Sequence, residues 1–177
     1  MRKSLRYLMS GAAAAMLLLV GAGCAEEFQT EEPTVESAKG GAAKGKVAKV
    51  GDKVTLKGTT YKVTNVRTAK SVGDSFAKET ANGKFVIVTV ALTNRKDEPA
   101  TIMSDNLKLI GGNGKQYTTS DDALFAVDDA LLLEEIQPDN GEKGQLVYDL
   151  PPKAVSGATL RVEDLFSDST AHIKLGL

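Results

Sequence analysis

Apolar residues recur at every second position along residues 85–94, and this period constrains the fold more than any other feature of the chain. Successive side chains of a strand point to opposite faces, so Val86, Val88, Val90 and Leu92 would share one face. A helix would need a period near 3.6 residues, which this segment lacks. The pattern therefore predicts a β-strand that belongs to a hydrophobic core.

The same alternation recurs along the chain and is interrupted by turn residues. Further strands are predicted at 54–56, 60–66, 107–110, 115–119, 131–136, 144–150, 160–162 and 173–177. Turn signals separate them at 51–52, 58–59, 82–83, 111–114 and 138–141. Residues 120–127 combine an N-cap candidate with early acids, which allows a short helix there. Many short strands with frequent turns predict an all-β, antiparallel β-sandwich.

Two groups of apolar residues have more than one interpretation. Phe85 and Ile87 lie on the strand face opposite Val86, so either a central strand or a cap buries them, or they form an exposed interaction patch. The run from Leu131 to Leu133 raises the same question, because three consecutive side chains cannot all point into one face of a sheet.

The N-terminus has the pattern of an export signal. Arg2, Lys3 and Arg6 precede an apolar run at 11–20, and small residues follow. A transmembrane helix needs roughly 20 apolar residues, and this run is shorter. We therefore expect residues 1–23 to be a signal peptide.

The end of this segment resembles the lipobox of bacterial lipoproteins, with Ala22-Gly23-Cys24 matching and Gly21 standing at the usual leucine position. The resemblance implies cleavage between Gly23 and Cys24, a diacylglyceryl group on Cys24 and an acylated (palmitate-type) new N-terminus. The lipid bilayer would then be a partner, at the extracytoplasmic side of the cell membrane. Ordinary cleavage would instead leave Cys24 as a free thiol. Cys24 is the only cysteine, so no internal disulfide can form.

Composition limits what the exported chain can bind. Removing 23 of the 177 residues leaves 154 and takes away three basic residues and no acid, so the formal charge goes from −1 to −4. This balance argues against nucleic acid as a partner. Residues 24–45 are rich in Glu, Lys, Gly and Ala, which predicts a disordered linker, and 46–177 would form the folded domain.

The order of the pieces carries a family resemblance. Gly83-Lys84-Phe85 opens the longest strand, Leu92-Thr93-Asn94 closes it, and Val147-Tyr-Asp-Leu-Pro151 follows late in the chain. Over residues 47–177 the chain is similar to a telokin-like, immunoglobulin-like domain family of bacterial lipoproteins and secreted antigens, whose function is unknown. The resemblance implies an immunoglobulin-like antiparallel β-sandwich and supplies no catalytic residue.

No set of residues predicts catalysis, so we expect no enzyme, no cofactor and no metal. His172 is the only histidine and lies on the expected outer side of the last strand, which makes a hydrolase the weakest hypothesis. Acids crowd residues 121–140, where carboxylates could serve a calcium ion, although no EF-hand spacing is present.

Two functions follow from this pattern. The first is a membrane-anchored, non-enzymatic interaction module with an envelope protein as its partner. The second is a lipoprotein that binds a small ligand or calcium near residues 120–140 and serves a transporter or sensor. The oligomeric state stays open.

Overall fold

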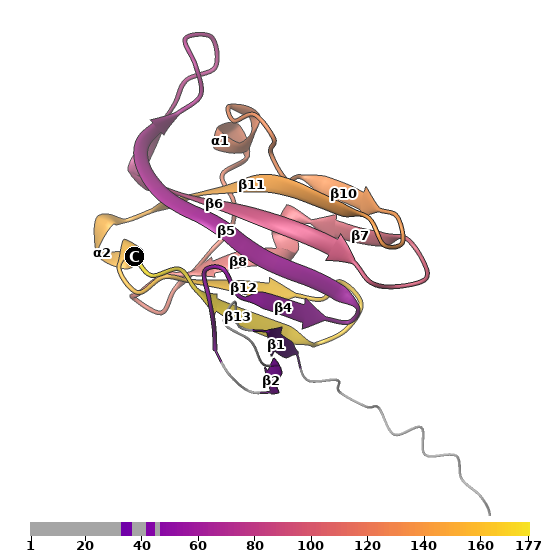
Figure 1. Cartoon of the computed structure of the whole chain (residues 1–177). Coiled ribbons are helices and arrows are strands. Elements are labelled where there is room, and N and C mark those ends of the chain that lie inside the picture. Colours follow the sequence, from indigo (N-terminus) through magenta and orange to yellow (C-terminus); the bar gives the residue numbers. More distant parts are fainter. Residues whose placement is uncertain (1–32, 37–41, 45–46) are drawn as a thin grey trace, which may run out of the picture.

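The computed structural model describes residues 33–36, 42–44 and 47–177 (Figure 1). The expected signal peptide at 1–23, the expected lipid attachment at Cys24 and most of the expected linker lie outside these residues. Within the described part of the chain, no helix is long and apolar enough to cross a membrane.

Two stacked β-sheets and a two-stranded ribbon contain most of the regular structure, so the predicted β-sandwich is confirmed. The larger sheet has the order β11-β6-β5-β4-β1-β2, with strands Gly141–Leu150, Glu79–Asn94, Thr59–Val72, Lys53–Leu56, Thr34–Glu36 and Ala42–Lys44. The opposing sheet has the order β3-β13-β12-β8-β9, with strands Ala48–Lys49, Thr170–Lys174, Thr159–Glu163, Leu107–Ile110 and Gln116–Tyr117. The ribbon pairs β10 (Leu133–Ile136) with β7 (Ala100–Met103).

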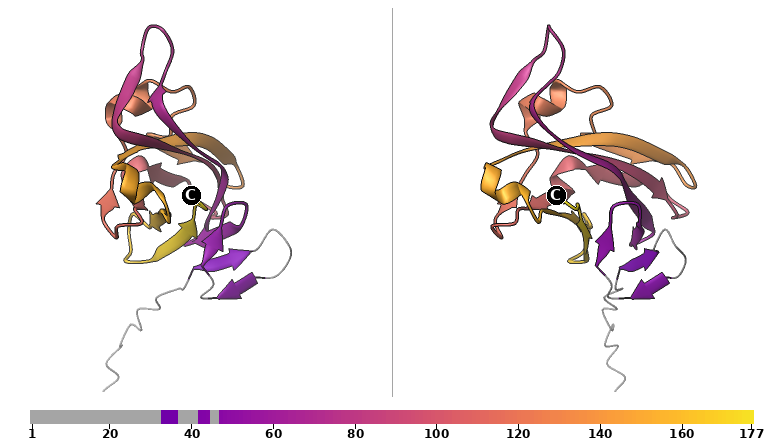
Figure 2. Two further views of the ribbon diagram at one scale, coloured as in Figure 1. Left: turned by 90° about the vertical axis from the view of Figure 1, so that its left-hand side faces the viewer. Right: turned by 60° about the vertical axis from the view of Figure 1, so that its left-hand side comes forward.

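The hydrophobic core lies between the two sheets (Figure 2). The alternating residues of β6 that the sequence placed on one face, Val86, Val88, Val90 and Leu92, are all buried there. Side chains from β8, β12 and β13 meet them from the opposing sheet. The period-2 pattern therefore predicted both the strand and its core face correctly.

The outer face of the larger sheet is partly covered by a short helix, α1 (Asp121–Phe125), at the position predicted for one. Ala123 and Leu124 of this helix pack with Phe85 and Ile87 in a second apolar cluster. A cap therefore buries Phe85 and Ile87, and they form no exposed patch. In Figure 1, α1 lies over β11 and β6.

The β5–β6 hairpin is longer than the sequence predicted. Pairing runs from Thr59 opposite Asn94 to Val72 opposite Glu79, so the chain reverses at residues 73–78. The turn expected at Asn82-Gly83 is wrong, because both residues lie inside β6. Both figures show the hairpin loop projecting beyond α1 (Figures 1 and 2).

The segment before residue 46 contains order that its composition did not predict. β1 pairs antiparallel with β4, with Val35 opposite Val54, and Val35 is buried in the main core. β2 pairs with β1 in turn. For these described residues the expectation of a disordered linker is wrong, because one apolar side chain and an open strand edge are enough to dock a short strand.

Two smaller expectations also change. The last strand ends at Lys174 rather than at the C-terminus, because Gly176 has a positive φ that is incompatible with an extended strand. Of the three consecutive leucines, Leu131 is buried and Leu133 is exposed. A separate helix α2 (Pro152–Val155) and a 3-10 turn (Ser104–Asn106) complete the described structure.

Candidate interaction surface

The residues that the sequence analysis considered for catalysis or metal binding do not lie together in one site. Gly23 and Cys24 lie outside the described residues. His172 is exposed on β13 opposite Arg161, and no hydrogen bond joins it to a serine or carboxylate within the part that the structure describes. The acids between 121 and 140 are spread over α1, the following loop and β10. Among the described residues, no group of three or more His, Cys, Asp or Glu could hold a metal ion.

Asn94, at the end of β6, ties three segments together. Its side-chain amide donates to the backbone carbonyl oxygens of Glu98 at 2.7 Å and Ile136 at 2.9 Å. Its side-chain oxygen accepts the backbone N–H of Lys96 at 2.9 Å. Asn94 is fully buried, so these bonds satisfy polar groups that have no access to water. Its function is to fix the loop after β6.

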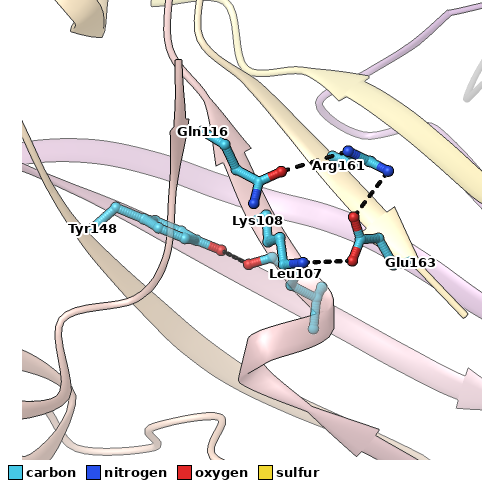
Figure 3. Close-up of polar contacts among 6 residues, drawn as sticks. All are labelled: Leu107, Lys108, Gln116, Tyr148, Arg161 and Glu163. Carbon is cyan, nitrogen blue, oxygen red and sulfur yellow. Dashed lines mark hydrogen bonds and ion pairs between the residues drawn. The ribbon is translucent and has the colours of Figure 1, made fainter. Parts of the chain in front are cut away.

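Tyr148 and Asp149, in the late motif, also bind the backbone. The buried Tyr148 hydroxyl donates to the carbonyl oxygen of Leu107 at 2.6 Å and joins the two sheets (Figure 3). Burial raises the pKa of Tyr148, so this hydroxyl keeps its proton. The Asp149 carboxylate accepts the backbone N–H groups of Asn82 at 2.7 Å and Gly83 at 3.0 Å. These residues of the family-like pattern are thus structural.

A charged network covers part of the outer face of the smaller sheet. Glu163 accepts Lys108 at 2.8 Å and Arg161 at 3.0 Å, and Arg161 also reaches Gln116 at 3.5 Å (Figure 3). The Lys108–Glu163 pair therefore joins the adjacent strands β8 and β12, whereas Arg161 and Glu163 pair along the same strand, β12. Such partly exposed pairs contribute little to stability, typically about 0–1 kcal/mol.

The tip of the β5–β6 hairpin presents an unusual aromatic residue. Phe76 is 96% exposed, more than any other large apolar residue of the described chain. Asp74 accepts the backbone N–H groups of Phe76 at 2.8 Å and Ala77 at 3.1 Å, and these bonds lower the pKa of Asp74. Gly73 has a φ of +86°, and a Cβ there would lie 1.9 Å from the Ala77 carbonyl oxygen. The loop conformation is therefore fixed by its own sequence.

A concavity of about 360 Å³ lies between this loop and the end of α1. Gly73, Asp74 and Ala77 line it from the hairpin, and residues 125–128 line it from the helix side. Phe125 is 73% exposed. We call Phe76, Phe125 and the concavity the aromatic tip. Exposed aromatic side chains beside a hollow are typical of surfaces that bind another protein.

The opposite end of the sandwich has a second, open concavity of about 1050 Å³. It lies among the β4–β5 turn, the β6–β7 loop and the β12–β13 loop, and its lining includes Lys96, Glu98, Asp164 and Phe166. Phe166 is 82% exposed. Burial, and secondarily the negative charge of Asp164, raise the pKa of the nearby Tyr61, so its hydroxyl stays neutral. Both signs of charge are present among the lining residues.

Sequence reasoning did not single out Phe76, Phe125 or Phe166. The available signal was weak: Phe76 and Phe166 each have a serine as one neighbour, and Phe125 stands between Leu124 and Ala126 in the segment expected to form a short helix. An isolated phenylalanine of this kind is as compatible with a satellite core as with an exposed loop. The tertiary arrangement alone distinguishes the buried Phe85 from the exposed three.

Comparison with known proteins identifies a family and a fold. The family model described as "Domain of unknown function (DUF4352)" matches residues 48–171. No protein with a curated description matches the sequence significantly.

Several solved structures share the architecture. The yjhA protein of Bacillus subtilis is 16% identical with a TM-score of 0.58, over 73% of this chain and 99% of that one. The secreted protein MPT63 of Mycobacterium tuberculosis is 13% identical with a TM-score of 0.55, over 75% and 97%. A candidate lipoprotein of Bacillus subtilis, ycdA, is 14% identical with a TM-score of 0.54, over 70% and 38%. Identities this low indicate a shared fold and carry no function.

Proposed function

Because the chain belongs to the family described as a domain of unknown function (DUF4352), we propose its function from its own geometry. We propose an exported, membrane-anchored lipoprotein whose telokin-like, immunoglobulin-like sandwich is a non-enzymatic protein-interaction module at the cell envelope. Residues 1–23 would be removed, Cys24 would carry the lipid, and 46–177 would form the module, with the strands at 34–36 and 42–44 docked on it.

Export and anchoring are supported by the N-terminal pattern and by the neighbours. MPT63 is described as secreted and ycdA as a candidate lipoprotein, and both resemble this chain in fold. The Ala22-Gly23-Cys24 sequence supplies an acylation site. A single acyl chain binds a membrane only marginally, whereas the several chains of a lipoprotein anchor would hold it stably.

The path of the chain would set the orientation of the module. Thr34 enters the sheet opposite Thr55, close to the β4–β5 turn, and nine residues separate it from Cys24. Nine extended residues reach at most about 32 Å. The 14 residues of β5 lead away from this turn over about 45 Å at 3.3 Å per residue. An anchor at Cys24 would therefore leave the aromatic tip at the end far from the lipid.

The observation that carries the proposed function is the exposure of Phe76 and Phe125 at that far end. Tyr, Trp and Phe are enriched in the buried centres of protein interfaces relative to the rest of the surface. Exposed carboxylates lie near them, at Asp74 on the loop and at Asp121 and Asp128 at α1, and outnumber the nearby cations Arg67 and Lys78. We therefore expect a protein partner that offers apolar side chains rimmed by basic residues.

In-cell cross-linking of the full-length, tagged protein, followed by mass spectrometry, tests this function. We expect one envelope protein to be enriched, and expect Phe76→Ser with Phe125→Ser to abolish that enrichment. Phe166→Ser is the matched control, because it removes an equally exposed phenylalanine from the other end. Cys24→Ala tests whether anchoring matters. Enrichment that survives the double substitution, or that is lost equally in the control, would reject the aromatic tip as the binding surface.

A ligand-binding lipoprotein remains the second proposal, supported by the concavity beside residues 125–128, inside the region that the sequence singled out. A rise in melting temperature with calcium or with a small metabolite, lost in Asp128→Asn, would favour it. Flat melting curves across ions and metabolites would count against it.

A further inference from the structure

Away from α1, the outward-facing residues on the outer face of the larger sheet have an uneven charge distribution. Core residues such as Val54, Val63 and Val90 point inward, so their neighbours along each strand point outward. Four strand segments supply these outward positions: β4, β5 up to residue 67, β6 from residue 87 and β11 up to residue 147. These positions include four cationic residues and no carboxylate. The cationic residues are Lys53, Lys62, Arg67 and Lys143. A chain with an overall negative charge thus has a cationic face.

Three of these lysines lie in one row across the sheet. Lys53 is the register partner of Lys62, Lys62 is the partner of Ala91, and Ala91 is the partner of Lys143. The row therefore crosses β4, β5, β6 and β11 at right angles to the strands, over about 14 Å at 4.7–4.9 Å per strand. Among the described residues, the only carboxylate in register with the row is Glu36, opposite Lys53 on β1.

Threonines flank the row. Thr55, Thr60 and Thr93 are register partners in the next row on the same face, and the Thr55 and Thr60 hydroxyl oxygens lie 2.9 Å apart. Thr89 stands on the other side of the row, opposite Gln145. Hydroxyl and ammonium groups both donate hydrogen bonds to phosphate oxygens. We define the lysine strip as Lys53, Lys62 and Lys143 with these threonines.

We propose that the lysine strip binds a linear polymer of phosphate groups laid across the strands. Directly opposed like charges such as Lys53 and Lys62 destabilise a sheet, and an anion placed over them removes that penalty. No ion pair of these three lysines occurs among the described residues. A single phosphate could meet all three ammonium groups only if the lysine side chains leaned toward one point, whereas a chain of phosphates can meet them along the whole row.

The surroundings favour a slim polymer over an anionic membrane. Helix α1 lies on the same side of the sheet, and its exposed Asp121 and Asp122, with Asp128 and Asp129 after it, carry negative charge. A planar anionic surface that approached this face would meet these carboxylates. A narrow chain, in contrast, can lie along the row of lysines without contacting these carboxylates. This site is separate from the aromatic tip, so it stands or falls independently of the protein partner.

Fluorescence anisotropy with labelled linear polyphosphate of about 30 units, titrated with the purified full-length chain at several salt concentrations, tests the proposal. We expect binding that weakens steeply with salt, because each neutralised phosphate releases counterions. We expect Lys53→Gln, Lys62→Gln and Lys143→Gln together to weaken binding more than tenfold and to flatten the salt dependence. The melting temperature of this triple variant should stay the same or rise, because the substitutions remove the opposed like charges of Lys53 and Lys62.

The matched control is Lys115→Gln, Lys153→Gln and Lys174→Gln, which removes the same charge from exposed positions away from the strip. We expect this control to retain most of the affinity. Equal losses in the two triple variants would mean that net charge alone drives binding and would overturn the proposal. Absence of polyphosphate binding, or strip-dependent binding only to vesicles of anionic lipid, would overturn it as well.

Discussion

Tyr148 donates its buried hydroxyl to the carbonyl oxygen of Leu107 on the opposing sheet. Asn94 and Asp149 likewise use their side chains to satisfy backbone groups at the ends and irregularities of strands. Gly83, whose backbone N–H the Asp149 carboxylate accepts, must be a glycine, because a Cβ there would lie 2.1 Å from the Leu150 carbonyl oxygen. At the residue scale, the polar part of the family-like pattern therefore specifies the sandwich and leaves binding to other residues.

We expect Tyr148→Phe to lower the free energy of unfolding by about 1–2 kcal/mol. The substitution keeps the buried ring but leaves the Leu107 carbonyl without this donor in a dry environment. Urea denaturation of the full-length protein would measure the change. Tyr117→Phe is the control, because its hydroxyl bonds only to the exposed Asn113 side chain, and its effect should stay within about 0.5 kcal/mol. Equal effects of the two substitutions would contradict a structural role for Tyr148.

At the scale of elements, the part of β6 from Phe85 to Val88 is buried on both faces, with one side in the main core and the other under α1. α1 has five residues, far fewer than the roughly 12–15 that an isolated helix needs in water. Its stability must come from the packing of Ala123 and Leu124 against the sheet. The helix also lines the concavity of the aromatic tip, so this packing positions the proposed binding surface.

Adjacent residues of α1 give a direct test of this packing. Leu124→Ala should cost about 2–5 kcal/mol, because it removes a fully buried side chain from the smaller cluster. Phe125→Ala should cost less than about 0.5 kcal/mol, since that ring is mostly exposed. Amide hydrogen exchange should show faster exchange in residues 121–127 for the first variant only. Similar costs would show that α1 is not held by Leu124.

At the scale of the whole molecule, the layers must be stable without covalent cross-links. Cys24 is the only cysteine, and it lies outside the described residues. The main hydrophobic cluster contains residues from both sheets and includes Val35 of β1. Contacts between residues that are far apart in the sequence therefore stabilise the fold. Small exported domains often rely on disulfides, whereas this one relies on its core.

We therefore expect the melting temperature of the purified protein to be unchanged by dithiothreitol. Differential scanning calorimetry with and without the reductant measures this, with Cys24→Ser as the reference that contains no thiol. A fall in melting temperature under reductant, in the wild type but not in Cys24→Ser, would reveal a stabilising intermolecular disulfide and contradict the expectation.

The sequence by itself determined the fold class, the central strand, its core face and the position of α1. These features depend on local periodicity and on capping and turn residues, which neighbouring side chains largely decide. It missed the strand at Thr34–Glu36 and misread Asn82-Gly83 as a turn, because the partners of both segments, Val54 and Asp149, are distant in the chain.

Only the tertiary structure decided which surfaces are available for binding. Phe85 and Phe125 are the same residue type, yet the first is buried under α1 and the second is mostly exposed. Likewise, strand register alone brings Lys53, Lys62 and Lys143 into one row. The overall negative charge of the chain gives no sign of this cationic row. Exposure and charge clustering are set by contacts between distant segments, so local sequence patterns do not determine them.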